Sequence, residues 1–109
     1  MDFDTYQKKS RKTAVYPNIG KNHVYPTLGI VGEAGEIANK MGKVMRDDKN
    51  KITPQRKRDI SHELGDILWF IAQLSTELKL SLNDIAKENI KKLQSRLKRG
   101  ELRGSGDNR

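Results

Sequence analysis

The sequence contains no cysteine, so disulfide bonds and thiolate chemistry are excluded. No apolar run approaches the ~20 residues that a membrane-spanning helix needs. The first ten residues, MDFDTYQKKS, lack the apolar segment of a secretory signal. We therefore expect a soluble intracellular protein with no signal peptide and no membrane partner.

The chain is short and strongly basic. Its 109 residues suit one domain with a modest core. Apolar residues make up 34% and charged residues 33%, so association of several chains would help to enlarge that core. The formal net charge of +8 favours polyanionic partners such as nucleotides or nucleic acid, but it also fits a solvated lysine-rich surface.

Apolar residues recur at intervals of three and four rather than two, which predicts helices and no strands. We predict helices over residues 3–13, 26–45, 54–79 and 82–98. The fold class is all-α, an antiparallel bundle of about four helices in which the second, third and fourth pack together and oligomerisation completes the core. Residues 1–99 form the predicted domain, and residues 100–109 form a flexible basic tail.

Two pairs of carboxylates occur at helical spacing. The segment GEAGEIANK, residues 32–40, sets Glu33 and Glu36 one turn apart, and HELGDILWF, residues 62–70, does the same for Glu63 and Asp66. A projection at about 100° per residue places Glu63 inside an apolar arc and Glu33 at the edge of another.

Converging carboxylates need a cation, because burying unpaired charge costs several kcal/mol. A hard divalent ion such as Mg²⁺ or Mn²⁺ suits a set of oxygen ligands. Such acid pairs are also common on exposed helix faces. Their occurrence on two adjacent helices, both overlapping apolar arcs, favours a metal site over that interpretation.

The predicted second helix contains three glycines, Gly29, Gly32 and Gly35. Each lowers the stability of the helix by roughly 1 kcal/mol relative to alanine. That cost is consistent with close approach of a ligand or with tight helix packing. In the fourth helix Asn89 lies on the apolar stripe, flanked by Lys92 and Arg96. These three residues are a candidate anion site, although Lys and Arg at helix edges commonly extend toward water.

GEAGEIANK, HELGDILWFIAQL and NIKKLQSR together resemble the MazG-like all-α nucleoside triphosphate pyrophosphohydrolases, from about Tyr6 to Arg96. The family pattern, E-x-x-E followed by E-x-x-D, is matched in full. The resemblance implies Mg²⁺-dependent hydrolysis of a (deoxy)nucleoside triphosphate to the monophosphate and pyrophosphate. It also implies homodimers or homotetramers, and a bacterial or phage-infected cytoplasm.

The resemblance also implies roles for individual residues. The metal ligands would be Glu33, Glu36, Glu63 and Asp66. Glu36 and Glu63 are the predicted catalytic residues, and Glu36 is the candidate for activating water. The substrate-binding residues would be Lys40, Asn89, Lys92 and Arg96. The position of Trp69, three residues after Asp66, makes it a further candidate for substrate binding by stacking on the base, with contact to a partner chain as the open alternative.

Two other functions compete with this prediction. The same scaffold serves phosphoribosyl-ATP hydrolysis, which a substrate test would separate. A non-enzymatic helical module that binds nucleic acid would explain the net charge, and its binding would be sensitive to salt but not to EDTA. We rank nucleic acid low as a partner because such a module leaves the acids in the apolar arcs unexplained.

Overall fold

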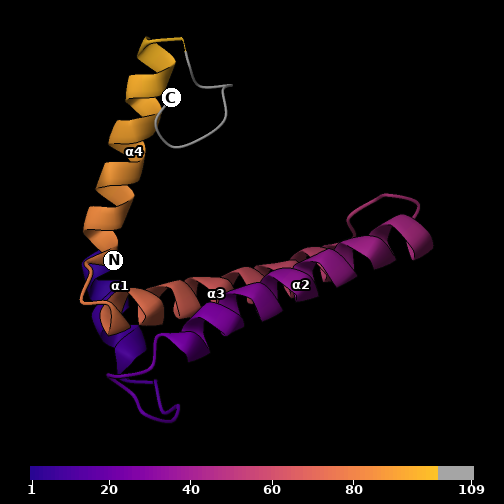
Figure 1. The fold of residues 1–109 in the computed structure, drawn as a ribbon. Helices are drawn as coiled ribbons and strands as arrows, with labels where there is room; N and C mark the ends of the chain where they lie inside the picture. The colour runs from indigo at the N-terminus through magenta and orange to yellow at the C-terminus, as the bar shows by residue number, and fades with distance from the viewer. Residues whose placement is uncertain (101–109) are drawn as a thin grey trace.

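A computed structural model describes residues 1–100 as four α-helices joined by turns (Figure 1). The helices are α1 (Phe3–Arg11), α2 (Val24–Asp47), α3 (Pro54–Glu77) and α4 (Leu82–Lys98). The described residues contain no strand, which confirms the all-α prediction. Within them no helix has the length and apolar character needed to cross a membrane. The predicted tail lies, from residue 101 on, outside the described residues.

Three helices begin at side-chain caps. Asp2, Thr53 and Ser81 each accept a hydrogen bond from a backbone N–H of the following first turn. The helix α2 begins two residues earlier than predicted, at Val24. Pro26 is accommodated within its first turn, where a missing N–H leaves no hydrogen bond unmade.

The two long helices α2 and α3 lie side by side and antiparallel, and they form a hairpin (Figure 1). The core of the described chain is small. The buried hydrophobic residues of this core are Tyr16, Val44, Ala72 and Leu82. Many large apolar side chains are exposed on the same helices, so a single chain leaves much apolar surface uncovered.

The fourth helix does not pack antiparallel on the second and third as predicted. Instead α4 projects at a steep angle from the hairpin, and its principal contacts are with α1 (Figure 1). The side chain of Gln7 accounts for this position. Its amide nitrogen donates to Thr76 Oγ1 and to the carbonyl of Leu80, and its amide oxygen accepts from the backbone N–H of Leu82. The α3–α4 turn is thereby tied to α1.

A buried carboxylate at the end of α3 fixes the segment that leads into α2. Glu77 Oε2 accepts hydrogen bonds from Arg11 at 2.7 Å, from the Tyr16 hydroxyl at 2.6 Å and from the backbone N–H of Gly20 at 2.9 Å. Its other oxygen accepts from the N–H of Asn22 at 2.6 Å. Burial acts to raise the pKa of Glu77, but these hydrogen bonds outweigh it and lower the pKa to about 2.

Candidate metal centre

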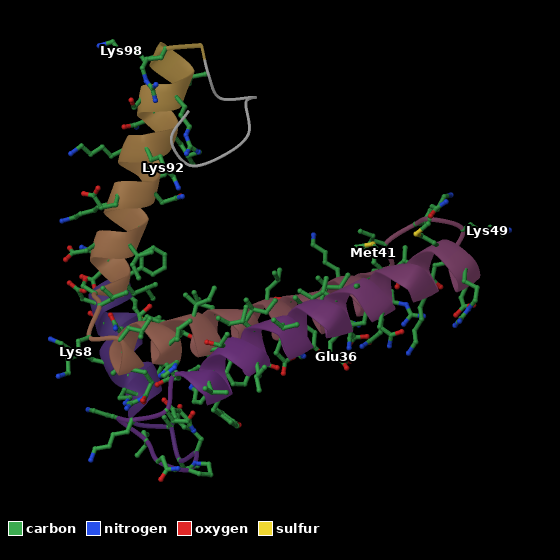
Figure 2. All side chains as sticks on the ribbon, viewed as in Figure 1. Lys8, Glu36, Met41, Lys49, Lys92 and Lys98 are labelled. Atoms are coloured by element: carbon green, nitrogen blue, oxygen red, sulfur yellow. The ribbon has the colours of Figure 1, made fainter. Side chains whose placement is uncertain are left out.

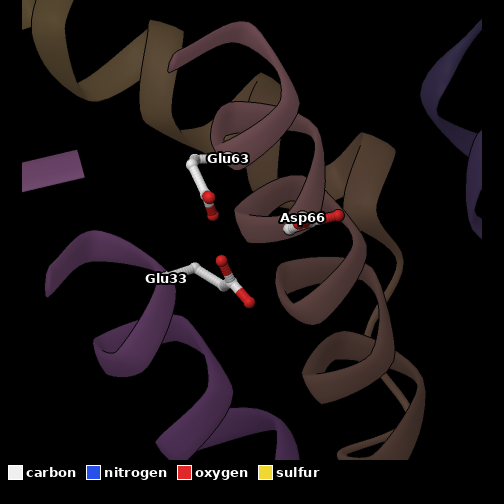
Figure 3. A group of neighbouring side chains, drawn as sticks. All are labelled: Glu33, Glu63 and Asp66. Atoms are coloured by element: carbon white, nitrogen blue, oxygen red, sulfur yellow. The ribbon is translucent and has the colours of Figure 1, made fainter. Parts of the chain in front are cut away.

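Three of the four predicted ligands converge between α2 and α3. Glu33 comes from α2, and Glu63 and Asp66 come from successive turns of α3. Each offers a carboxylate oxygen, and these oxygens lie within 4.8 Å of one another. Figure 3 shows the Glu33 and Glu63 carboxylates facing each other across the hairpin. Glu33 and Glu63 are half-buried and Asp66 is exposed, so the group opens to solvent on one side.

The electrostatics of the group show how closely the acids approach. A hydrogen bond with Glu63, partial burial and repulsion from Glu63 and Asp66 raise the pKa of Glu33 to about 7. The same hydrogen bond, together with one from Lys40, lowers the pKa of Glu63. The close approach of the two glutamates therefore favours a proton on Glu33 over one on Glu63. A hard divalent cation fits this donor set, because it would replace that proton and satisfy all three carboxylates.

Lys40 joins the fourth acid to the group. Its ammonium Nζ lies 3.0 Å from Glu63 Oε1 and 4.0 Å from Glu36 Oε2. Glu36 lies on the outer side of this lysine, with 56% of its side chain exposed, and is not among the three convergent acids. The predicted four-carboxylate cluster therefore appears as three acids plus a peripheral glutamate, bridged by a lysine.

The cationic residues predicted on the fourth helix lie elsewhere in this chain. Because α4 projects away from the hairpin, the structure does not bring Asn89, Lys92 or Arg96 to the acids. Figure 2 shows Lys92 on α4, well away from Glu36 on α2. Asn89 and Lys92 line an open groove of about 610 Å³ at the α3–α4 corner, and Arg96 is buried. Their role in binding substrate stays a prediction.

Trp69 belongs to an aromatic cluster. Its ring packs edge-to-face against Phe70, with centroids 5.1 Å apart, and against Tyr16 at 6.4 Å. Its indole N–H donates to Thr13 Oγ1 at 2.8 Å. These contacts account for Trp69 through packing within the chain, and its predicted stacking on a base stays a prediction.

The glycines of α2 fall into two kinds. A Cβ atom at Gly29 would overlap the ring of Phe70, so this glycine permits close packing of α3 on α2. A Cβ atom at Gly32 or Gly35 would meet nothing within 4 Å. Those two positions flank Glu33 and Glu36 on open surface. Close packing within the chain therefore explains Gly29 alone of these three.

Sequence reasoning missed Tyr6 as a neighbour of this site. Its pKa is raised by burial and by the negative charge of Asp66. Tyr6 comes from α1, and no spacing along the chain links it to Asp66. Only the packing of α1 on α3 reveals the pair.

Residues 22–100 match the family model described as the MazG nucleotide pyrophosphohydrolase domain. This chain belongs to the MazG family. The match covers both acid pairs and extends to the end of α4. MazG membership confirms the resemblance drawn from the two acid motifs, and it indicates a nucleotide pyrophosphohydrolase.

Two relatives of this MazG chain are also similar in sequence. Gene 37 protein of Mycobacterium phage L5 is 46% identical over 114 aligned residues, which cover 100% of both chains. The uncharacterized protein YvdC of Bacillus subtilis (strain 168) is 31% identical over 72 residues, which cover 62% of this chain and 68% of YvdC. No solved structure matches the chain significantly.

Proposed function

We propose that this protein hydrolyses (deoxy)nucleoside triphosphates to the monophosphate and pyrophosphate at the carboxylates between α2 and α3. The observation that carries the proposal is the convergence of Glu33, Glu63 and Asp66 within the span that matches the MazG domain. The hydrogen bond with Glu63, partial burial and repulsion among the three acids raise the pKa of Glu33. An arrangement that is electrostatically costly on its own is expected where a cationic ligand offsets the cost.

The proposed cofactor is Mg²⁺, with Mn²⁺ as an alternative. Glu33, Glu63 and Asp66 would hold it, and Glu36 would join them by a rotation of its exposed side chain. When bound, the ion supplies charge neutralisation on the phosphates and a more acidic water. The ligand atoms that converge here from Glu33, Glu63 and Asp66 are carboxylate oxygens, which these hard ions prefer.

Glu36 and Lys40 have further proposed roles, in water activation and in phosphate binding. Glu36 is exposed and borders the convergent acids, so its carboxylate could, instead of binding the ion, accept the proton of the attacking water. Lys40 would exchange its contact with Glu63 for a phosphate oxygen of the substrate. Its ammonium would then stabilise the negative charge that moves onto the leaving pyrophosphate.

We further propose that the protein acts as a homodimer or homotetramer. Val24, Leu28 and Val31 follow one another along α2 with more than half of each side chain exposed. On α4, Ile90 and Leu97 are exposed to a similar degree. Packing of these faces against a second copy would bury them. It would also offer Asn89 and Lys92 to the acids of the other copy, whereas Arg96 is buried in its own chain.

A nucleotide panel with product identification tests the reaction. The expected products with Mg²⁺ are the nucleoside monophosphate and pyrophosphate, separated by ion-exchange chromatography, and EDTA should abolish their formation. Release of phosphate and a diphosphate would show that the bond assignment is wrong. Phosphoribosyl-ATP belongs in the same panel, because the related scaffold hydrolyses it. If phosphoribosyl-ATP were the one compound hydrolysed, the proposal that (deoxy)nucleoside triphosphates are the substrates would be wrong.

The variant Glu63→Gln tests the site. It should reduce turnover by a factor on the order of 10³ or more, since one ligand and the partner of Lys40 are lost together. Glu88→Gln is a matched control, because Glu88 is an exposed glutamate on α4. Circular dichroism should show the same helix content in both variants. Full activity in Glu63→Gln would refute the assignment.

A further inference from the structure

The far end of the α2–α3 hairpin carries most of the net charge of the protein. Residues 43–58, which we call the hairpin tip, contain seven Lys and Arg residues and two Asp residues, a net charge of +5 in a chain of +8. Figure 2 shows Lys49 at this end, remote from α1 and α4. So many like charges on a narrow element repel one another, which is expected where a polyanion binds.

Both acids of the hairpin tip are already neutralised by neighbours. Asp47 pairs with Arg46 at 2.8 Å, and Asp48 pairs with Arg56 at 2.9 Å. Within residues 1–100 the other cations of the tip form no ion pair. They are Lys43, Lys49, Lys51, Lys57 and Arg58. All five except Lys43 are exposed, so a positive surface without compensating charge faces solvent.

The turn at the tip holds its lysines in a defined geometry. Lys49 and Asn50 have φ angles of +54° and +63°, a region that lysine rarely adopts. The backbone N–H groups of Asp48 and Asn50 both donate to the carbonyl of Val44 at 3.1 Å and enforce this conformation. The ion pair between Asp48 and Arg56 closes the turn onto α3. Lys49 and Lys51 therefore project from a fixed scaffold.

We propose that the hairpin tip binds the phosphate backbone of double-stranded DNA, without reading its sequence. Duplex DNA has the closely spaced charges that several fixed cations match, one per about 1.7 Å of axis. Single strands are usually held by stacking bases on aromatic rings, and residues 43–58 contain no aromatic residue. A DNA-binding surface at the tip is separate from the acids between α2 and α3, which keep their proposed role in binding a metal ion. Glu63 lies seven residues along α3 from Arg56, about 10 Å by the helical rise.

Fluorescence anisotropy with a labelled duplex of ~20 base pairs tests the proposal over about 50 to 200 mM NaCl. EDTA is present, so that a metal at the acids cannot bridge to DNA. The full chain is compared with the triple variant Lys49→Gln, Lys51→Gln, Lys57→Gln. Loss of three phosphate contacts should weaken binding on the order of 100-fold at about 0.1 M salt and reduce the salt slope by nearly three.

The matched control is the triple variant Lys9→Gln, Lys21→Gln, Lys87→Gln, which removes three exposed lysines outside the tip. It should bind DNA within a few-fold of the unmodified chain. Nucleotide hydrolysis should be unchanged in both triple variants, and DNA binding unchanged in Glu63→Gln, so failure of one proposal leaves the other standing. Three results would overturn the DNA proposal: no measurable binding at about 50 mM salt, an equal loss in the control, or tighter binding of single-stranded DNA, RNA or polyglutamate.

Discussion

The ammonium of Lys40 lies 3.0 Å from Oε1 of Glu63 and joins the two long helices across the acid cluster. The contact raises the pKa of Lys40 through the hydrogen bond, which keeps the lysine charged. A fixed positive charge therefore lies beside the carboxylates that we propose as metal ligands. The positive charge of Lys40 repels a metal ion bound at these carboxylates, and it attracts the phosphates of a nucleotide.

Lys40→Met should separate these two effects. Mg²⁺ should bind several-fold more tightly, because a competing cation is gone. The KM for the nucleotide should rise about 10-fold, because a charge-assisted contact with phosphate is lost. Calorimetric titration with Mg²⁺ and steady-state kinetics measure the two quantities. Lys43→Met, which also removes a positive charge from α2, is the control. Weaker Mg²⁺ binding with an unchanged KM would contradict both assignments.

Glu33→Gln should stabilise the metal-free protein at high pH. The pKa of Glu33 is raised to about 7 from an ordinary value of 4.5, through its hydrogen bond with Glu63, burial and repulsion. The folded state then binds more protons than the unfolded state between these values, so stability falls as pH rises from about 4.5 to 7. Replacing Glu33 removes that penalty, and we expect Tm at pH 8 in EDTA to rise by about 4 °C.

The control for this prediction is the same measurement at pH 4, where Glu33 is mostly protonated in both the folded and the unfolded state and the variant should gain little. Saturating Mg²⁺ should reverse the order at pH 8, because the unmodified site binds the ion and is stabilised by it. A variant less stable than the parent in EDTA at pH 8 would show that the carboxylates do not repel as described.

Sequence periodicity predicted the helices and the acid pairs because both are local features. Glu33, Glu63 and Asp66 could be placed together from two E-x-x-acid motifs once α2 and α3 were taken as neighbours. The position of α4 could not be predicted in this way. It depends on contacts with α1, among them those of Gln7, whose partners lie 69 to 75 residues away in the chain.

The structural role of Glu77 could not be predicted either, because it also depends on partners that are distant in the chain. Glu77 occupies an unremarkable position near the end of a helix, and its partners come from α1 and from the segment before α2. No spacing marks a carboxylate that accepts backbone hydrogen bonds from a distant loop. Its side chain is 1% exposed, a degree of burial that only tertiary packing produces.

Gly29→Ala and Gly32→Ala should have opposite effects on stability. A Cβ atom at Gly29 overlaps the Phe70 ring, which is itself packed against Tyr25 and Trp69, so we expect a loss of about 2 kcal/mol. At Gly32 the added methyl group meets nothing in this chain, and helix propensity alone should give a gain of up to about 1 kcal/mol. Urea unfolding measures both. A loss at Gly32 would instead indicate that a second copy packs against that position.

Glu77→Gln should destabilise the protein in a way that depends on pH. Hydrogen bonds from Tyr16, Asn22, Gly20 and Arg11 overcome the effect of burial and lower the pKa of Glu77 to about 2, from an ordinary value of 4.5. A lowered pKa contributes stability that is complete above 4.5 and is lost as pH falls toward 2. At pH 7 the variant should lose about 3 kcal/mol, because Arg11 is left without its buried carboxylate.

The loss should shrink when the two proteins are compared at pH 3, within the window where the parent itself loses the contribution of Glu77. Urea unfolding at pH 7 and pH 3 gives the two differences in the free energy of unfolding, and Glu88→Gln, at an exposed site on α4, should show none at either pH. An equal loss for Glu77→Gln at both pH values would mean that packing, and not the charge of Glu77, holds the segment from Arg11 to Asn22 in place.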